Sequence, residues 1–373
     1  MPSDATASAS TPSSAAPFWV SLALPPLALL GALEGGWTVI LLPLVTWYLF
    51  SGLDLAIGRN TENADPLTPL RVLRWHTAIT LIWAPVQFVM LFWLLWYVPR
   101  ADHLGTAESL ALFFGAGVIT GTVGINYSHE LMHQRSRLER WMADLLLAMV
   151  LYSHFRSEHL LVHHRWVGTP RDAVTARYDE GFYRFFPRVL LQSLVSAFRA
   201  EADMLARKKQ HWASPANPFC RYLVLQAFMI ALALTLSGWV GLGLFALQAF
   251  TAVWQLELVN YIEHYGLTRR RLENGRYEPV RPHHSWNSDQ RASNWLLINL
   301  QRHSDHHFKP DRRFPVLQTY PGDEAPQLPF GYPVMTMAAM VPPLWRRIMH
   351  PRVRAWRRRH YPDIDDWTAY ADT

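Results

Sequence analysis

The sequence contains little cysteine and little charge. Cys220 is the single cysteine among 373 residues, which excludes a disulfide framework, a cysteine-rich zinc site and a cysteine-ligated iron–sulfur cluster. Charged residues make up 17% of the chain and hydrophobic residues 50%, whereas a soluble domain carries about 25% charge. Residues 1–16 contain no Lys or Arg, so they lack the basic start of a secretory signal peptide. We predict that they form a disordered tail.

Long apolar runs organise most of the chain. Six of them have the roughly 17–25 residues that a helix needs to cross a bilayer. Pro85 interrupts the third run and predicts a kink there. The sequence therefore predicts an all-α integral membrane protein with six transmembrane helices and a cytosolic, histidine-rich cap. The six runs are Pro17–Leu33, Gly36–Ile57, His76–Val98, Glu108–Ile125, Tyr222–Ser237 and Trp239–Val259.

The distribution of basic residues orients these helices. With a cytosolic N-terminus, all 35 Lys and Arg residues except Arg100 lie in cytosolic segments, as the positive-inside rule requires. This distribution also accounts for the net charge of +6 without a nucleic-acid partner, for which the chain carries no motif. We therefore predict that both termini are cytosolic.

Three regions are predicted along the chain. After the tail of residues 1–16, residues 17–340 form the membrane domain, in which helices of the 126–221 segment lie under or dip into the membrane from the cytosolic side. Residues 341–373 form a basic amphipathic tail that contains Trp345, Trp356 and seven arginines. Such a helix suits the surface of an anionic membrane, and the same surface would suit an acidic redox partner.

Nine of the 17 histidines fall in groups with the spacing of ligands on a helix. HELMH places two imidazoles four residues apart, on one helical face. EHLLVHH gives spacings of four and five, HSDHH gives three and four, and NYIEHYG adds a single histidine where the sixth run ends. All these motifs fall on the predicted cytosolic side, so they can converge on one site. The nine are His129, His133, His159, His163, His164, His264, His303, His306 and His307.

These histidines predict a metal site, because nine clustered imidazoles without a ligand would form a costly polar core. HExxH alone indicates a zinc peptidase, but a catalytic zinc takes three protein ligands and nine histidines suit two ions. Imidazole binds zinc, copper, iron and nickel alike, so spacing does not choose the metal. Ligating imidazoles usually donate their other N–H to a carboxylate, and the nearby candidates are Glu130, Glu158, Asp172, Glu263 and Asp305.

These motifs resemble those of the AlkB-type membrane-bound alkane 1-monooxygenases, within the membrane fatty acid desaturase/hydroxylase family. The wider family is marked by three histidine motifs, which read HELMH, EHLLVHH and LQRHSDHH in this chain. The resemblance to the alkane branch is closer, through NYIEHYGL, LENGRYE, PHHSWNS and LQRHSDHH in that order. Met132, Gln134 and Val162 depart from residues that are common in that branch, but none of these departures removes a ligand.

The resemblance implies a reaction and its cofactors. The nine histidines would bind two non-haem iron ions, with no catalytic residue beyond these ligands, and the enzyme would hydroxylate the terminal methyl of medium- to long-chain n-alkanes to 1-alkanols with O2. Electrons would come from a rubredoxin and an NAD(P)H-dependent rubredoxin reductase, because the chain has no CxxC pair and no GxGxxG in a strand–helix context. The implied location is the bacterial inner membrane. A narrow apolar tunnel could admit an alkane end-on, and its candidate residues are Trp37, Trp47, Trp83, Phe88 and Phe92.

Several alternatives stay open. A fatty-acyl desaturase, a carotenoid hydroxylase and a methyl-arene hydroxylase share the family motifs, and the NYIEHYGL and LQRHSDHH sequences argue against the first two. A metal transporter would place its ligands near the bilayer midplane, whereas these motifs lie at the cytosolic ends of the runs. A soluble zinc peptidase disagrees with six apolar runs.

Overall fold

Helices make up the regular structure of the chain. The computed structural model describes residues 11–368, and within them it contains helices and no β-strand beyond three isolated bridges. The predicted all-α fold is confirmed. The elements before residue 150 are η1 (Ala16–Ala23), α1 (Leu24–Glu34), η2 (Gly36–Ile40), α2 (Leu41–Pro43), η3 (Leu44–Leu49), α3 (Phe50–Ile57), α4 (Arg74–Tyr97), η4 (Val98–Arg100), α5 (Thr106–Ile119), η5 (Thr120–Ile125), α6 (Asn126–Met132) and α7 (Arg137–Ala148).

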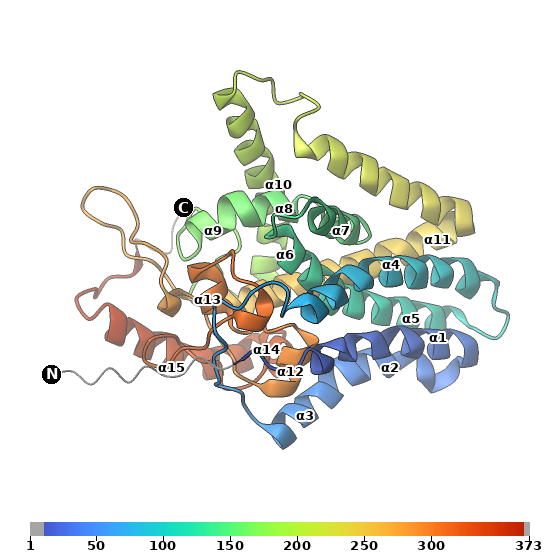
Figure 1. Cartoon of the computed structure of the whole chain (residues 1–373), viewed down its shortest axis with the longest axis horizontal. Coiled ribbons are helices and arrows are strands. Elements are labelled where there is room, and N and C mark those ends of the chain that lie inside the picture. Colours follow the sequence, from blue (N-terminus) through green and yellow to red (C-terminus); the bar gives the residue numbers. More distant parts are fainter. Residues whose placement is uncertain (1–10, 369–373) are drawn as a thin grey trace.

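The second part of the chain combines short helices with three long ones, α10, α11 and α15. Figure 1 shows α10 and the first part of α11 standing away from the other helices. The elements are α8 (Phe155–Glu158), η6 (His159–His163), α9 (His164–Trp166), α10 (Phe182–Arg207), α11 (Pro218–His264), η7 (Pro282–His284), α12 (Arg291–Leu296), α13 (His303–Phe308), η8 (Phe314–Val316), α14 (Tyr332–Ala339) and α15 (Pro342–His360).

The long apolar helices form an elongated bundle, in which α1, α2, α4, α5 and the second part of α11 lie side by side (Figure 1). Five helical segments are long and apolar enough to cross a membrane, and the chain is a multi-pass membrane protein. α4 continues through Pro85 without ending there, and the kink at this residue stays a prediction. The five segments are Ala16–Glu34, Gly36–Ile57, Arg74–Arg100, Thr106–Met132 and Pro218–His264.

α11 is interrupted once along its length. Ser237 (φ −149°, ψ 26°) and Gly238 (φ 57°, ψ −147°) leave the helical conformation, and the positive φ of Gly238 favours a residue without a Cβ. Figure 1 shows that the two parts of α11 run in opposite directions on either side of this break. Each part contains one of the predicted runs 222–237 and 239–259. The count of six membrane spans stays a prediction.

Glycines allow α5 and η5 to lie directly against α11. A Cβ on Gly117 would come within 2.6 Å of the Gln248 carbonyl oxygen, and one on Gly121 within 2.7 Å of the Ala252 carbonyl oxygen. No side chain fits at either position, as is common where membrane helices pack through small residues. This close contact fixes the distance between the helices that end in the HELMH and NYIEHYG motifs.

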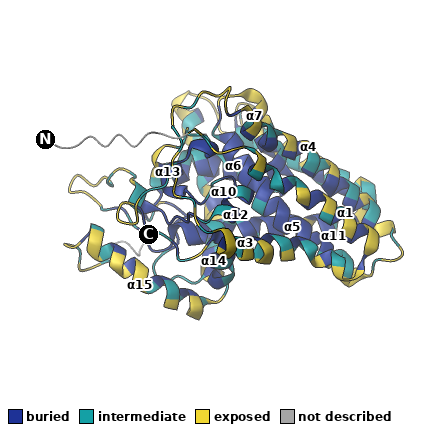
Figure 2. Cartoon of the chain, turned by 60° about the horizontal axis from the view of Figure 1, so that its bottom comes forward, coloured by how far each residue is buried: buried dark blue, intermediate teal, exposed yellow. Residues whose placement is uncertain are grey.

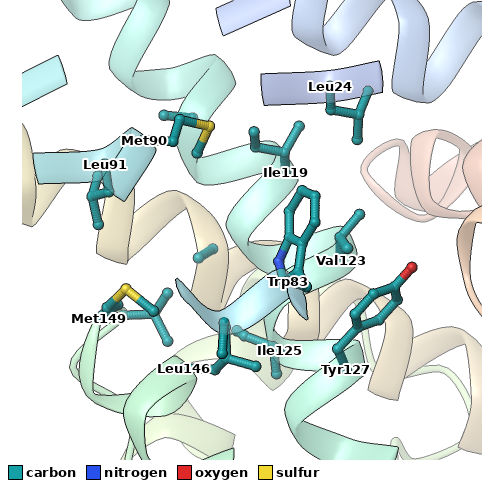
Figure 3. Close-up of a cluster of buried hydrophobic side chains, with 14 of the residues drawn as sticks. Leu24, Trp83, Met90, Leu91, Ile119, Val123, Ile125, Tyr127, Leu146 and Met149 are labelled. Carbon is teal, nitrogen blue, oxygen red and sulfur yellow. The ribbon is translucent and has the colours of Figure 1, made fainter. Parts of the chain in front are cut away.

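The interior of the bundle is mostly apolar. Figure 2 shows buried residues along the inside of the bundle and exposed residues on its outer faces. Trp83 lies in this interior beside Ile119, Val123 and Tyr127 (Figure 3). Its indole Nε1 donates to Gln87 Oε1 at 2.8 Å, which satisfies a group that would otherwise be unpaired in an apolar environment.

A second apolar core joins α15 to the end of α11. One face of α15 buries Trp345, Met349, Val353 and Trp356, while most of its arginines face outward. This packing gives the predicted basic tail a helix with one buried face. The three-region division stays a prediction, and residues 1–10 of the N-terminal tail and 369–373 of the C-terminal tail lie outside the described residues.

Candidate metal centre and adjoining cavity

The ends of helices carry the nine predicted ligands. His129 lies in α6 and His133 directly follows it, one turn later. His264 is the last residue of α11, and the HSDHH histidines lie in the short helix α13. η6 is a π-helix, whose i→i+5 hydrogen bonds bring residues four and five apart toward the same side. The widened turn therefore lets His163 and His164 both point into the site.

The histidines form two compact groups. Their ligand atoms lie within 4.8 Å of one another in each group, and the groups are His129, His133, His159 and His306, and His163, His264, His303 and His307. In the first group His159 Nε2 lies 2.9 Å from His129 Nε2 and 3.1 Å from His133 Nε2. In the second, His303 Nε2 lies 3.2 Å from the Nε2 of His264 and 3.0 Å from that of His307.

These separations suit metal ligation. Two nitrogens about 2.1 Å from one ion, at roughly a right angle, lie about 3.0 Å apart. The ninth histidine, His164, extends the first group, because its Nε2 lies 2.9 Å from His159 Nε2 and 3.1 Å from His306 Nε2. The structure thus brings all nine predicted histidines together, with ring nitrogens aimed at two neighbouring points.

Burial favours the neutral form of four of these imidazoles. It lowers the pKa of His133 to about 3, with a smaller contribution from the charge of His163. Burial also lowers the pKa values of His159, His306 and His307 well below their ordinary range, assisted by the neighbouring histidines. A neutral imidazole keeps a nitrogen lone pair for a metal ion, so these rings are ready to bind one at neutral pH.

Two of the five predicted carboxylates adjoin ligand imidazoles. Asp172 Oδ2 lies 2.9 Å from His163 Nδ1, and it also accepts from the Thr175 hydroxyl at 2.7 Å. Glu263 Oε1 lies 3.3 Å from His303 Nδ1. The hydrogen bond to Asp172 orients the His163 ring so that its Nε2 points away from the carboxylate. Glu263 lies close to the His303 ring without a hydrogen bond to it.

The other three carboxylates have different surroundings. Glu130 accepts from Gln134 Nε2 at 3.0 Å, and Asp305 accepts from Arg312 at 2.6 Å. Both oxygens of Glu158 are buried without a hydrogen-bond partner among the described residues. Burial raises the pKa of this carboxyl well above its usual range, and the nearby Asp172 raises it further. Both effects favour the protonated form of Glu158.

A narrow cavity leads from the apolar helices to the histidines. Its volume open to the centre of a water molecule is about 60 Å³. It touches His129 and His159 of the first group and His303 of the second. Its walls come mainly from η3, η5, the second part of α11, α12 and α14, and they are mostly apolar. Such a shape suits a slender apolar molecule whose end approaches the histidines.

Comparisons with known proteins identify the family. The sequence matches the family model "Fatty acid desaturase" over residues 106–339. An alkane 1-monooxygenase 2 of Pseudomonas aeruginosa is 39% identical over 84% of this chain and 83% of its own length. The chain belongs to the fatty acid desaturase family, and within it to the alkane 1-monooxygenases. The predicted resemblance is confirmed.

Two further relatives of this chain show how far the sequence similarity extends. An alkane 1-monooxygenase 2 of Alcanivorax borkumensis is 37% identical over 82% of this chain and 80% of its own length. The xylene/toluene monooxygenase hydroxylase component of Pseudomonas putida is 32% identical over 65% of this chain and 64% of its own length. The alkane 1-monooxygenases are thus more identical to this chain, and over a larger share of its length, than the xylene/toluene hydroxylase.

One of the five predicted tunnel residues of this monooxygenase lines the cavity. Trp47, on η3, is half-buried and forms part of the wall. Trp37, Trp83, Phe88 and Phe92 do not line it. Trp37 is 71% exposed, whereas Trp83 and Phe92 are buried in the bundle core. Within a uniformly apolar run, the identity of an aromatic residue does not indicate whether it faces the cavity, the bundle core or the outside.

A third group of potential ligands, which contains two histidines and one glutamate, forms a hydrogen-bond network instead of a metal site. Glu278, His283 and His284 have ligand atoms within 4.8 Å of one another, but His284 Nδ1 accepts from the Arg281 backbone N–H at 2.9 Å. Its proton therefore lies on Nε2, which faces the Tyr361 hydroxyl at 2.8 Å and has no free lone pair for a metal. Burial would raise the pKa of Glu278, but hydrogen bonds from His284 and Tyr361 outweigh it and lower the value to about 2.

Arg269 is a positioning residue that sequence reasoning missed. It is buried, and its Nη1 donates to the backbone carbonyls of Arg165 at 3.0 Å and Val167 at 3.3 Å. Those carbonyls follow His164, while Arg269 itself follows His264. One guanidinium therefore ties together two segments that carry predicted ligands from different parts of the chain.

Replacing Arg269 by methionine is expected to lower the metal content of the purified protein. The methionine fills similar space but leaves the two carbonyls unpaired, and loss of such supporting contacts costs about 10–100-fold in metal affinity. The measurement is metal per chain by elemental analysis after dialysis at graded chelator concentrations. Arg271→Met, at an exposed site, is the matched control. Equal metal retention in the two variants would contradict the positioning role.

Proposed function

We propose that this enzyme hydroxylates the terminal methyl of medium- to long-chain n-alkanes to 1-alkanols. The observation that carries the proposal is the narrow apolar cavity that ends on histidines of both groups. One atom of O2 enters the alcohol and the other leaves as water, and the reaction consumes two electrons and two protons. The names of the relatives, alkane 1-monooxygenases, support the same substrate class.

Two non-haem iron ions are the proposed cofactors. His129, His133, His159, His164 and His306 would hold one, and His163, His264, His303 and His307 the other, in keeping with the two groups. Imidazole is a suitable ligand for redox-active iron. When bound, the reduced ions supply the chemistry that activates dioxygen for attack on an unactivated C–H bond.

The side chains of the enzyme position the substrate and the ligands. The cavity excludes water and holds an alkane lengthwise, so that its terminal methyl lies nearest to His129, His159 and His303. Internal C–H bonds are weaker, and only confinement of the chain places the methyl ahead of them. Asp172 holds the ring of His163 in the orientation that would direct its Nε2 to the metal.

The proposed electron source is a rubredoxin reduced by an NAD(P)H-dependent reductase, and the proposed location is the bacterial inner membrane. The single cysteine leaves no room for a cysteine-ligated electron carrier within the chain. The distribution of Lys and Arg supports cytosolic termini and a cytosolic histidine site. A cytosolic site is accessible to a soluble electron carrier.

Product analysis tests this proposal. Purified enzyme in lipid nanodiscs receives rubredoxin, reductase, NADH and n-alkanes of graded length, and alcohols are resolved by gas chromatography. We expect 1-alkanols without internal alcohols. Failure to form 1-alkanol from any length, with iron bound, would refute the alkane proposal. Benzylic alcohol from a methyl-arene in that case, or an unsaturated fatty-acyl product, would identify a related activity.

A further inference from the structure

A wide groove lies beside the ligand-bearing turn η6 and shares no lining residue with the substrate cavity. It is formed between α10 on one side and η6, α9 and the loop that follows them on the other, and it has a volume of about 820 Å³. Along α10 its wall repeats every four residues, through Leu191, Val195, Arg199, Asp203 and Arg207. Such spacing presents a single face of the helix to the groove.

The groove carries more positive than negative charge, and its arginines form no ion pair with described residues. Arg165, Arg171, Arg199 and Arg207 line it and are exposed, and none of them takes part in the ion pairs found among residues 11–368. Asp203 is the one acidic side chain among its described lining residues. A concave surface with charge of one sign attracts an oppositely charged partner.

Trp166 of α9 lines the groove between two of its arginines. The guanidinium carbons of Arg165 and Arg171 lie 4.9 Å and 4.6 Å from the centroid of the Trp166 ring. Arginine and tryptophan are the side chains that most often dominate the binding energy of protein interfaces. Exposed apolar residues of α10, Leu191 and Val195, face the same groove.

The groove wall is covalently adjacent to the metal centre. Val162, in the wall, directly precedes the ligand His163, and Arg165 directly follows the ligand His164. Ala173, also in the wall, follows Asp172, which hydrogen-bonds to His163 Nδ1 at 2.9 Å. A molecule seated in the groove thus contacts η6, the element that carries His163.

We propose that this groove is the docking site of a small acidic protein that carries one electron at a time to the histidine site. The inference rests on the proposed function, in which each turnover consumes two electrons, so that two carrier molecules are each oxidised by one electron. Positive charge on the groove fits an acidic carrier, and its position places the carrier beside His163 and His164 without blocking the substrate cavity.

An anionic membrane surface is the other class of partner that arginines can bind, and the shape of the groove argues against it. A membrane surface is broad and contacts convex basic faces, such as the outer face of α15 with Arg347 and Arg358. The groove is concave, and it faces the turn that carries metal ligands. These features fit a compact protein that fills a hollow.

The test uses charge reversal on both walls of the groove. The double variant Arg171→Glu, Arg199→Glu changes one residue from each wall, and the double variant Arg347→Glu, Arg358→Glu makes the same change of charge on α15. Purified rubredoxin is titrated onto each protein in nanodiscs of zwitterionic lipid at low salt, and the Kd is measured directly. We expect the groove variant to raise the Kd at least about tenfold and to lose most of its salt dependence, while its metal content stays that of the unaltered protein.

Each outcome decides the proposal. An unchanged Kd in the groove variant, or an equal rise in the α15 variant, would overturn it. Loss of binding to vesicles with anionic lipid but not to rubredoxin would assign the groove to the membrane instead. Because binding is measured without alkane, the result is independent of turnover: absence of 1-alkanol from the unaltered enzyme would refute the proposed function and leave the docking result standing.

Discussion

Replacing His303 by alanine is expected to reduce 1-alkanol formation at least about 100-fold, because removal of a direct ligand should exceed the 10–100-fold cost of losing a supporting contact. His303 is one of four histidines in its group, and its Nε2 lies within 3.2 Å of two others. It also borders the substrate cavity, so its loss removes a proposed ligand beside the bound alkane. Metal per chain should fall toward half if that group alone is emptied. Alcohol yield and elemental analysis on the same preparation measure both effects.

His211→Ala is the matched control for this variant. His211 is exposed in the loop after α10 and belongs to neither histidine group. The control should retain metal and alcohol formation. A His303→Ala protein that kept its full metal content and its alcohol yield would remove His303 from the site and would weaken the assignment of its whole group.

Replacing Trp47 by alanine is expected to shift the preferred alkane toward longer chains. Trp47 lines the cavity from η3, in a part of the chain that carries no ligand histidine. Removing the indole lengthens or widens the space available to the far end of the substrate, while the end near the histidines is unchanged. Each methylene in an apolar pocket is worth about 10-fold or more in specificity, so the kcat/KM ratio of a longer to a shorter alkane should rise by at least that factor.

Competition between alkane pairs in one vessel measures this ratio directly. Trp37→Ala is the control, because Trp37 is 71% exposed and does not line the cavity. The same chain-length profile in the Trp47 variant and the unaltered enzyme would show that the indole does not limit the substrate. Equal shifts in both variants would point to a general effect on the bundle.

The nine histidines could be predicted from sequence because their signal is local. Spacings of three to five residues place side chains on one side of a helix, and imidazole is a common metal ligand. The convergence of separate motifs followed from predicted topology, since every motif lay at the same end of the apolar runs. The sequence did not indicate that η6 would be a π-helix, which is the reason that spacings of four and five work together at His163 and His164.

The cavity walls and Arg269 could not be predicted, because they depend on contacts between distant segments. Arg269 meets the carbonyls of Arg165 and Val167 across about a hundred positions of sequence, and a lone arginine after a histidine motif gives no sign of it. The same limit applies to the tunnel residues. Composition identified apolar runs rich in tryptophan, but the face that each run turns to the cavity is set by packing, and Trp47 alone of the five occupies it.

Like η6, the segments η3 and η5 are π-helices, and this shared irregularity bears on how the sequence of the enzyme can change. η3, η5 and η6 all line the cavity that reaches the histidines. A π-helical turn is a one-residue expansion of an ordinary helix, and it gives up regular backbone bonding to re-aim the side chains around it. Deleting a single residue from η6 would restore that regularity and rotate His163 and His164 by about 100° relative to His159. A regular α-helix at this place would not aim all three histidines at the site, so the arrangement of the histidines depends on the irregular turn.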